Sequence, residues 1–162
     1  MFNLAPADRR LTVKPPGQCM LDTGPKVHFH RPAADPLFKS AAQTFGSRVI
    51  GVVLTGRDSD GAEGLRAIKG AGGIGVVQNP AEAMAPDMPC RALAIDHPDF
   101  VVPLAELPAL LIRLTIQRQR SVDIQARAIP SPALRVAIFS LVGGDQRIEF
   151  KDLLLQVGDG VG

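Results

Sequence analysis

The chain has 162 residues, of which 46% are hydrophobic and 21% charged, as expected for one globular domain or for part of a larger one. Its 18 basic and 16 acidic residues give a net charge of +2, so no strong basic field predicts a nucleic-acid partner. No apolar stretch reaches about 18 residues and no signal-peptide pattern is seen, so membrane insertion is not predicted. Cys19 and Cys90 match no metal-binding spacing, and we expect free thiols in a reducing cytoplasm.

The first third of the chain predicts short strands and one helix. Residues 2–6 resemble the end of a strand, and the apolar runs 10–14 and 19–21 flank a Pro-Gly turn that predicts a hairpin. Asp35 precedes a proline, which predicts that Asp35 is the N-cap of a helix over 35–45. A glycine follows that helix and is expected to end it.

The most informative stretch is a run rich in Val and Ile, residues 49–55, followed at once by a turn that contains Asp58 and Asp60. An apolar run bounded by turn residues predicts a strand buried on both faces. The turn opens a predicted helix from Gly61 to about Gly72. Because chemistry in open parallel sheets collects at the carboxyl ends of the strands, both carboxylates lie where a site is expected.

The remaining elements continue the alternation of strand and helix. Strands are predicted at 74–77 and 100–102, and helices at 80–84, 88–95 and 107–119. Short connections between them predict a parallel sheet with right-handed crossovers. The predicted fold class is α/β, a partial doubly wound, Rossmann-like sheet in a three-layer α/β/α arrangement.

The alternation of predicted strands and helices stops near residue 120. We therefore expect two regions, 1–119 as the α/β unit and 120–162 as a tail of uncertain structure. Within the tail, the apolar run 134–142 could form one more strand, and the sequence predicts no further architecture there.

Asp60 has two interpretations. Glu63 lies three residues further on, which is the spacing of a capping box at the start of a helix. The alternative is an acid that orients a histidine in a hydrolytic triad. The two roles are compatible, because a turn at the end of a strand would hold the carboxylate rigidly in both.

Metal and nucleotide sites are disfavoured. Asp58 and Asp60 resemble part of a calcium loop, but the positions that should supply further ligands hold Gly56 and Ala67. Residues 70–75 match G-x-G-x-x-G, yet they follow a helix and enter a strand, which is the reverse of the dinucleotide-binding order. His28, His30 and Asp35 could begin a metal site, but no further ligands complete it, so neither a metal nor another cofactor is expected.

Several short motifs occur together in one order, each weak alone. They are Ala5-Pro6-Ala7-Asp8, His30-Arg31-Pro32-Ala33-Ala34-Asp35-Pro36-Leu37-Phe38, Gly51-Val52-Val53-Leu54-Thr55-Gly56 with Asp60-Gly61, Gly64-Leu65, Gln78-Asn79-Pro80 with Ala83, and Met88-Pro89. In this order and spacing, over roughly residues 4–112, they resemble the C-terminal half of the catalytic domain of CheB, the chemotaxis protein-glutamate methylesterase.

This resemblance implies a doubly wound α/β domain that hydrolyses glutamate methyl esters on chemoreceptors and deamidates receptor glutamines. The family's mechanism is a Ser-His-Asp triad without a metal or an organic cofactor. Asp60 lies where the family keeps its triad Asp, so the resemblance favours a catalytic role for Asp60, with a capping role as well. The implied partner is a methylated chemoreceptor in the cytoplasm.

The chain also departs from the family pattern. The family's nucleophile lies in a Gly-x-Ser-Thr-Gly-Gly stretch and its histidine in a His-Met-Pro stretch, and neither occurs in these 162 residues, nor does the receiver domain of many members. Arg10 replaces a His often seen in the family, and Arg57 stands where some members have a Met. His30 belongs to the His-Arg-Pro motif and is therefore not a candidate triad base.

Without that preceding half, the sheet would lack strands beside the central one. We then expect an exposed strand edge and a chain that is only marginally stable by itself, aggregates or pairs with another polypeptide. One hypothesis is a truncated methylesterase domain, inactive alone and complemented by a chain that supplies the Ser and His half. A second is a non-catalytic interaction module in chemotaxis-type signalling, and a third is a metal-dependent hydrolase using His28, His30, Asp58 and Asp60.

Overall fold

The structure is a computed structural model that describes residues 2–27, 29–125, 135–141 and 153–156. Its strands are β1 (Phe2–Leu4), β2 (Arg10–Lys14), β3 (Gln18–Asp22), β4 (Val49–Gly56), β5 (Ile74–Gln78), β6 (Phe100–Val102), β7 (Arg135–Leu141) and β8 (Leu153–Gln156). Its helices are α1 (Ala34–Phe45), α2 (Ala62–Gly70), α3 (Asp87–Ile95) and α4 (Leu107–Gln125), with short 3₁₀ turns η1 (Gly46–Arg48) and η2 (Leu104–Glu106).

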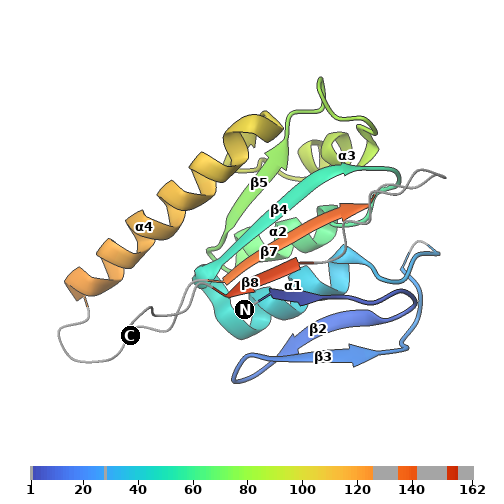
Figure 1. The fold of residues 1–162 in the computed structure, drawn as a ribbon, viewed down its shortest axis with the longest axis horizontal. Coiled ribbons are helices and arrows are strands. Elements are labelled where there is room, and N and C mark those ends of the chain that lie inside the picture. The colour runs from blue at the N-terminus through green and yellow to red at the C-terminus, as the bar shows by residue number, and fades with distance from the viewer. Residues whose placement is uncertain (1, 28, 126–134, 142–152, 157–162) are drawn as a thin grey trace.

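Six strands form one sheet in the order β1-β8-β7-β4-β5-β6, and β2 and β3 form a separate hairpin (Figure 1). β4 pairs in parallel with both β5 and β7, and β5 pairs in parallel with β6. β8 is antiparallel to its two neighbours, β7 and β1. The predicted α/β class with parallel central strands is confirmed.

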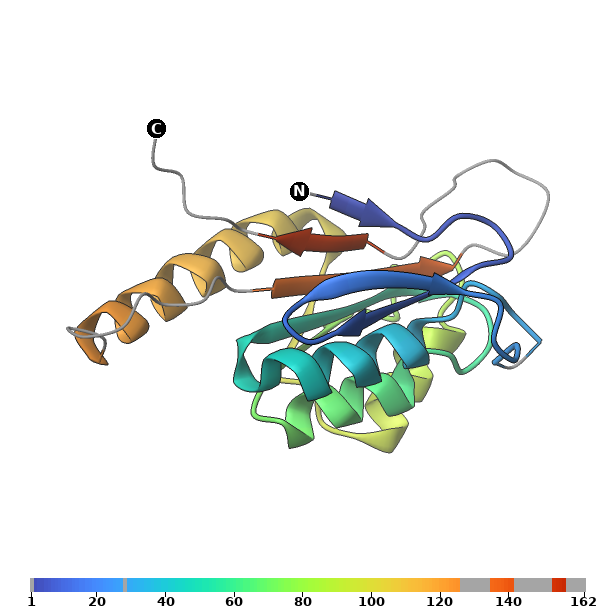
Figure 2. The same cartoon turned by 90° about the horizontal axis from the view of Figure 1, so that it is seen from below.

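Helices cover both faces of the parallel strands, with α1, α2 and α3 on one side and α4 on the other (Figure 2). Alternate residues of β4 explain this arrangement. Val49 and Val53 join the core beneath α1, α2 and α3, whereas Ile50 and Val52 join the core beneath α4. A strand whose two faces are both covered needs the unbroken apolar run that the sequence shows.

The hairpin β2–β3 packs against α1. Leu11 and Val13 point into the same core as α1, and the backbone N–H of Val13 donates to Ser40 Oγ at 3.0 Å. The predicted hairpin is therefore confirmed, and so are the predicted strands at 74–77 and 100–102 and the helix at 88–95, each with a shift of a residue or so at its ends.

The predicted helix at 80–84 is wrong. Asn79 instead accepts the Ala81 N–H through its side chain at 3.0 Å, which begins a turn. Ala85 is bound to the end of β4: its N–H donates to Thr55 Oγ1 at 2.8 Å, and its carbonyl accepts from the Gly56 N–H at 2.8 Å. These bonds to the end of β4 hold the segment as a loop.

The expectation of a free edge on β4 is also wrong. β7 lies along that edge, with Val52 paired to Ile138, and the register shifts between Val53 and Gly56, where Gly56 pairs with Leu141. The ends of the apolar run that predicted this strand, Leu134 and Val142, lie outside the described residues. α4 is longer than predicted and crosses residue 119 to end at Gln125.

No helix in the described part of the chain is both long enough and apolar enough to cross a membrane.

Candidate functional site

Asp60 lies in the turn between β4 and α2 and has no exposed surface. Its Oδ2 accepts the Ala34 N–H at 2.6 Å, and its Oδ1 accepts the Asp35 N–H at 3.0 Å and the Gly61 N–H at 2.9 Å. Ala34 and Asp35 are the first residues of α1. The carboxylate of Asp60 therefore binds the amino end of α1, whose first N–H groups have no partner within the helix.

The capping box predicted for Asp60 and Glu63 is wrong. The N-cap of α2 is Gly61, with φ of 88°, and no side chain within the helix caps it. Glu63 forms an ion pair with Arg66 at 2.8 Å instead. The left-handed conformation at Gly61 turns the chain sharply, which allows the Asp60 side chain to point at α1.

The prediction that Asp35 is the N-cap of α1 is wrong. The N-cap is Ala33, and Asp35 lies in the first turn of the helix. The Asp35 side chain reaches across to α2. Its Oδ1 accepts the Gly61 N–H at 3.1 Å and the Gly64 N–H at 2.6 Å. Asp60, just before α2, thus caps the amino end of α1, and Asp35, in the first turn of α1, caps the amino end of α2.

The environment of Asp60 opposes its ionisation. Burial raises the pKa of this carboxyl above 3.8, and the charge of Asp35 raises it further. The hydrogen bonds from Ala34, Asp35 and Gly61 act in the opposite direction, because they stabilise the carboxylate. The net pKa is raised, with loss of hydration as the main cause.

Asp58, in the same turn, faces a histidine. The distance between Asp58 Oδ2 and His30 Nε2 is 3.6 Å, and the His30 side chain is 46% exposed. Asp58 Oδ1 accepts the N–H of Ser59 at 2.6 Å. The backbone of Asp58 has a positive φ of 83°, so this turn is held in a conformation that L-residues seldom adopt.

The metal set considered from the sequence is not assembled. Asp35 is turned into the contact between α1 and α2, His30 faces Asp58, and His28 lies outside the described residues. Within the described residues, no group of three or more His, Cys, Asp or Glu side chains could hold a metal ion.

Arg31 anchors the segment that carries His30. Its Nη2 donates to Asp8 Oδ1 at 2.8 Å, and its Nη1 donates to the carbonyl oxygens of Thr23 at 2.7 Å and Gly24 at 2.8 Å. The Arg31 hydrogen bond lowers the pKa of Asp8. No role was predicted for this pair from the sequence, although each residue lies in one of the motifs that carry the family resemblance.

The carboxyl ends of β4 and β5 are joined by side chains. The Thr55 N–H donates to Gln78 Oε1 at 2.8 Å, and Gln78 Nε2 donates to Glu82 Oε1 at 3.2 Å. Gln78 is 4% exposed, so these bonds satisfy a buried amide. They keep the two strand ends and the loop after β5 in one arrangement beside the Asp58–Asp60 turn.

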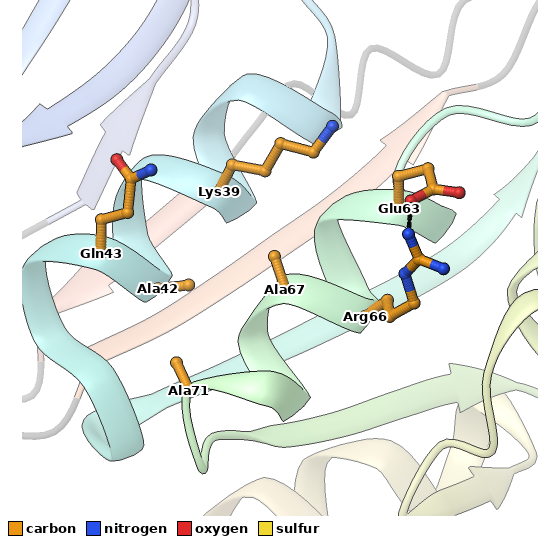
Figure 3. A pocket seen from close by; sticks show the side chains of 7 residues that line it. All are labelled: Lys39, Ala42, Gln43, Glu63, Arg66, Ala67 and Ala71. Carbon is orange, nitrogen blue, oxygen red and sulfur yellow. Dashed lines mark ion pairs between the residues drawn. The ribbon is translucent and has the colours of Figure 1, made fainter.

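A groove of about 490 Å³ lies on the outer side of α1 and α2, away from the sheet (Figure 3). Its lining consists of alanines and long polar side chains: Lys39, Ala42, Gln43, Glu63, Arg66, Ala67 and Ala71. Neither Asp58 nor Asp60 lines it. The groove is therefore distinct from the turn that holds the two acids.

Comparison with known proteins identifies the family. Residues 2–111 match the family model described as CheB methylesterase. The chain belongs to the CheB methylesterase family. The crystal structure of the Thermotoga maritima CheB methylesterase catalytic domain matches with a TM-score of 0.64 and 31% identity, over 67% of this chain and 59% of that chain. The resemblance inferred from the motifs is confirmed.

Curated relatives carry the same family of names. A putative protein-glutamate methylesterase/protein-glutamine glutaminase of Leptospira interrogans is 39% identical over 114 residues, which are 70% of this chain and 59% of the relative. The protein-glutamate methylesterase FrzG of Myxococcus xanthus is 39% identical over 110 residues, 68% of this chain and 33% of FrzG. This CheB-family chain thus matches less than two thirds of the length of these relatives.

Proposed function

We propose that this chain supplies the acid, Asp60, of the Ser-His-Asp triad of a protein-glutamate methylesterase. The serine and the histidine would come from polypeptide outside these 162 residues, on the same protein or on a separate chain. The observation that carries the proposal is a buried carboxylate at the carboxyl end of the central parallel strand, at the family's Asp-Gly motif. Alone, these residues would not hydrolyse an ester.

The hydrogen bonds of Asp60 leave room for one more donor. A carboxylate offers about four acceptor positions, two on each oxygen. Oδ1 accepts two N–H groups, and Oδ2 accepts one, from Ala34. The second position on Oδ2 could accept the Nδ1–H of an imidazole, which is how a triad acid fixes the tautomer and orientation of its histidine.

The chemistry then follows the triad. The serine Oγ attacks the carbonyl carbon of the glutamate methyl ester while the imidazole takes its proton. The imidazole returns that proton to the departing methanol, and water hydrolyses the acyl-serine to give glutamate and free serine. Asp60 would stay ionised and stabilise the imidazolium formed in each half of the reaction.

The burial of Asp60 adds a structural requirement. Because Asp60 has no exposed surface, an imidazole can reach it only if the atoms that cover it move. β7 also lies along the edge of β4 where the family resemblance places strands of the preceding half. We therefore propose that docking of the Ser and His half is accompanied by a rearrangement beside β4.

The substrate would be a methylated chemoreceptor, and the location the cytoplasm. The family membership supports this proposal, as do the names of the curated relatives. No nucleic-acid partner and no membrane insertion are proposed.

A second candidate is a non-catalytic interaction module of chemotaxis-type signalling. The specific observation in its favour is that Asp60 accepts its three hydrogen bonds from the backbone at the starts of α1 and α2. Such bonds give Asp60 a structural reason to be there without any chemistry.

The test is methanol release from a methylated chemoreceptor fragment. The chain is assayed alone, then with a polypeptide that carries the Gly-x-Ser-Thr-Gly-Gly and His-Met-Pro stretches. We expect activity in the mixture only, and its loss with Asp60→Ala. The control is Asp99→Ala, which removes a more exposed Asp–Gly hydrogen bond (2.7 Å to the Gly75 N–H) and an ion pair with Lys69 at the opposite end of the sheet. Activity that survives Asp60→Ala would contradict Asp60 as the triad acid. A folded chain that shows no activity alone or in the mixture would favour the interaction module.

A further inference from the structure

The contact between Asp35 and Asp60 is reciprocal. The Asp60 carboxylate accepts the backbone N–H of Asp35 at 3.0 Å, and the Asp35 carboxylate accepts the backbone N–H of Gly61 at 3.1 Å. Gly61 directly follows Asp60, so each acid holds the backbone at or beside the other. A second bond from Asp35 Oδ1, to the Gly64 N–H at 2.6 Å, extends the contact one turn into α2.

We propose that Asp35 is the positioning residue for the Asp60 carboxylate: by binding the N–H groups of Gly61 and Gly64, it fixes the turn that aims Asp60 Oδ2 toward a histidine. The inference rests on the proposed function for its catalytic meaning. Asp35 touches neither substrate nor serine in this account. It acts through Asp60.

The packing around this contact leaves little freedom. A Cβ on Gly64 would lie 2.5 Å from Phe38 Cβ and 3.0 Å from Asp35 Oδ1, so α1 and α2 touch here without spare room. A Cβ on Gly61 would lie 3.3 Å from Ala34 Cβ. Asp35 itself is 4% exposed, which shields its hydrogen bonds from competing water.

Two carboxylates share this buried contact, although their charges repel. The charge of Asp35 raises the pKa of Asp60, so an uncharged acceptor at position 35 would ease ionisation of Asp60. Loss of this charge would lower the pKa of Asp60 even if Asp35 served only to cap α2. The positioning role predicts in addition that Asp35→Ala displaces the Asp60 carboxylate and so disturbs its hydrogen bonds with the Ala34 and Asp35 N–H groups.

The experiment compares Asp35→Asn, Asp35→Ala and the control Asp99→Ala by NMR of the full chain. Asn keeps an oxygen acceptor in place of Oδ1 and removes the charge, whereas Ala removes both. With Asp35→Ala we expect the Gly64 amide proton, which loses its bond to Asp35, to shift upfield and to exchange faster. The Gly61 amide proton keeps its bond to Asp60 Oδ1 and should change less. With Asp35→Asn we expect those amides to stay near their wild-type positions and the pKa of Asp60 to fall. Asp99→Ala should change none of these signals.

The same variants in the methanol-release mixture separate the two claims. A displaced triad acid should lower the rate by about tenfold to a hundredfold in Asp35→Ala, and Asp35→Asn should restore most of it. Normal rates for both variants would overturn the positioning role, whatever the change in the pKa of Asp60. An inactive wild-type mixture would instead contradict the proposed function, and the NMR signals would still decide whether Asp35 positions Asp60.

Discussion

At the scale of single residues, Asp60 combines a costly burial with strong hydrogen bonding. Three backbone N–H groups donate to it in a site without exposed surface. Loss of the carboxylate leaves the Ala34 and Asp35 N–H groups without this acceptor, at about 1–3 kcal/mol for each buried group, whereas the Gly61 N–H keeps its bond to Asp35. We expect Asp60→Ala to lower the free energy of unfolding by about 2 kcal/mol at acidic pH and by less near neutral pH, as measured by urea denaturation.

The pH dependence of that difference has a defined sign. The pKa of Asp60 is raised in the folded chain above its usual 3.8, mainly by burial. The stability that this group contributes is fully present below the unfolded pKa and is lost as the pH rises through the raised folded pKa. Wild type should therefore lose stability relative to Asp60→Ala as the pH rises through that window.

Asp22 provides the opposite control. The Arg10 hydrogen bond lowers the pKa of Asp22, so its contribution is present above the unfolded value near 3.8 and is lost as the pH falls through the lowered folded value. The stability difference between wild type and Asp22→Ala should thus shrink on acidification. If the stability difference from wild type changed with pH in the same direction for Asp60→Ala and Asp22→Ala, the electrostatic explanation would be contradicted.

Phe29 carries backbone strain without compensating burial. Its φ is 67° and its side chain is 92% exposed. Glycine adopts this conformation without strain, but it also increases the entropy of the unfolded chain. Relief of the strain should be the larger effect, so Phe29→Gly should raise the free energy of unfolding by about 0.5 kcal/mol. Met84 is the control: it is 78% exposed but not in the left-handed region, so Met84→Gly should lower stability.

At the scale of elements, the packing of α1 against α2 depends on a glycine. Gly64→Ala would bring a Cβ to 2.5 Å from Phe38 Cβ, so we expect a loss of about 1–3 kcal/mol although alanine favours helix. Gly70→Ala in the same helix meets nothing within 4 Å and should raise stability by about 0.4–1 kcal/mol. Thermal unfolding of the two variants gives the comparison, and a stabilised Gly64→Ala chain would contradict the close contact.

Most elements were predictable from local pattern, because the apolar periods of β4, α1 and α2 lie within the sequence itself. The loop after β5 was not, since its hydrogen bonds go to Thr55, which lies about thirty residues earlier in the chain. The position of Asp60 was predictable from the motif, but its partners were not. Spacing suggested Glu63, whereas the carboxylate binds the start of α1, and only tertiary structure could show this.

At the scale of the whole molecule, β7 is the element that completes the sheet beside β4. A chain shortened to end at Gln125 would present the β4 edge to solvent, and exposed edges promote pairing with other chains. We expect the shortened chain to self-associate more than the full chain at equal concentration, as measured by light scattering after size-exclusion chromatography. A shortened chain that stays monomeric would show that β7 does not protect this edge.

The same edge bears on assembly with a preceding half of the domain. The chain matches 59% of the Leptospira interrogans relative and 59% of the solved Thermotoga maritima domain. In this CheB-family chain, two features oppose the proposed docking of the Ser and His half: β7 is paired with the edge of β4, and Asp60 is fully buried. Assembly should therefore be slower than diffusion alone allows, because a packed strand must move first.

The central claim is that Asp60 accepts a hydrogen bond from a triad histidine, and proton NMR of the reconstituted mixture tests it most directly. We predict a strongly deshielded imidazole Nδ1–H signal when this chain is added to the Ser and His half. The signal should vanish with Asp60→Ala and persist with Asp99→Ala. A signal that survives Asp60→Ala, or hydrolysis without any such signal, would contradict the assignment of Asp60 as the triad acid.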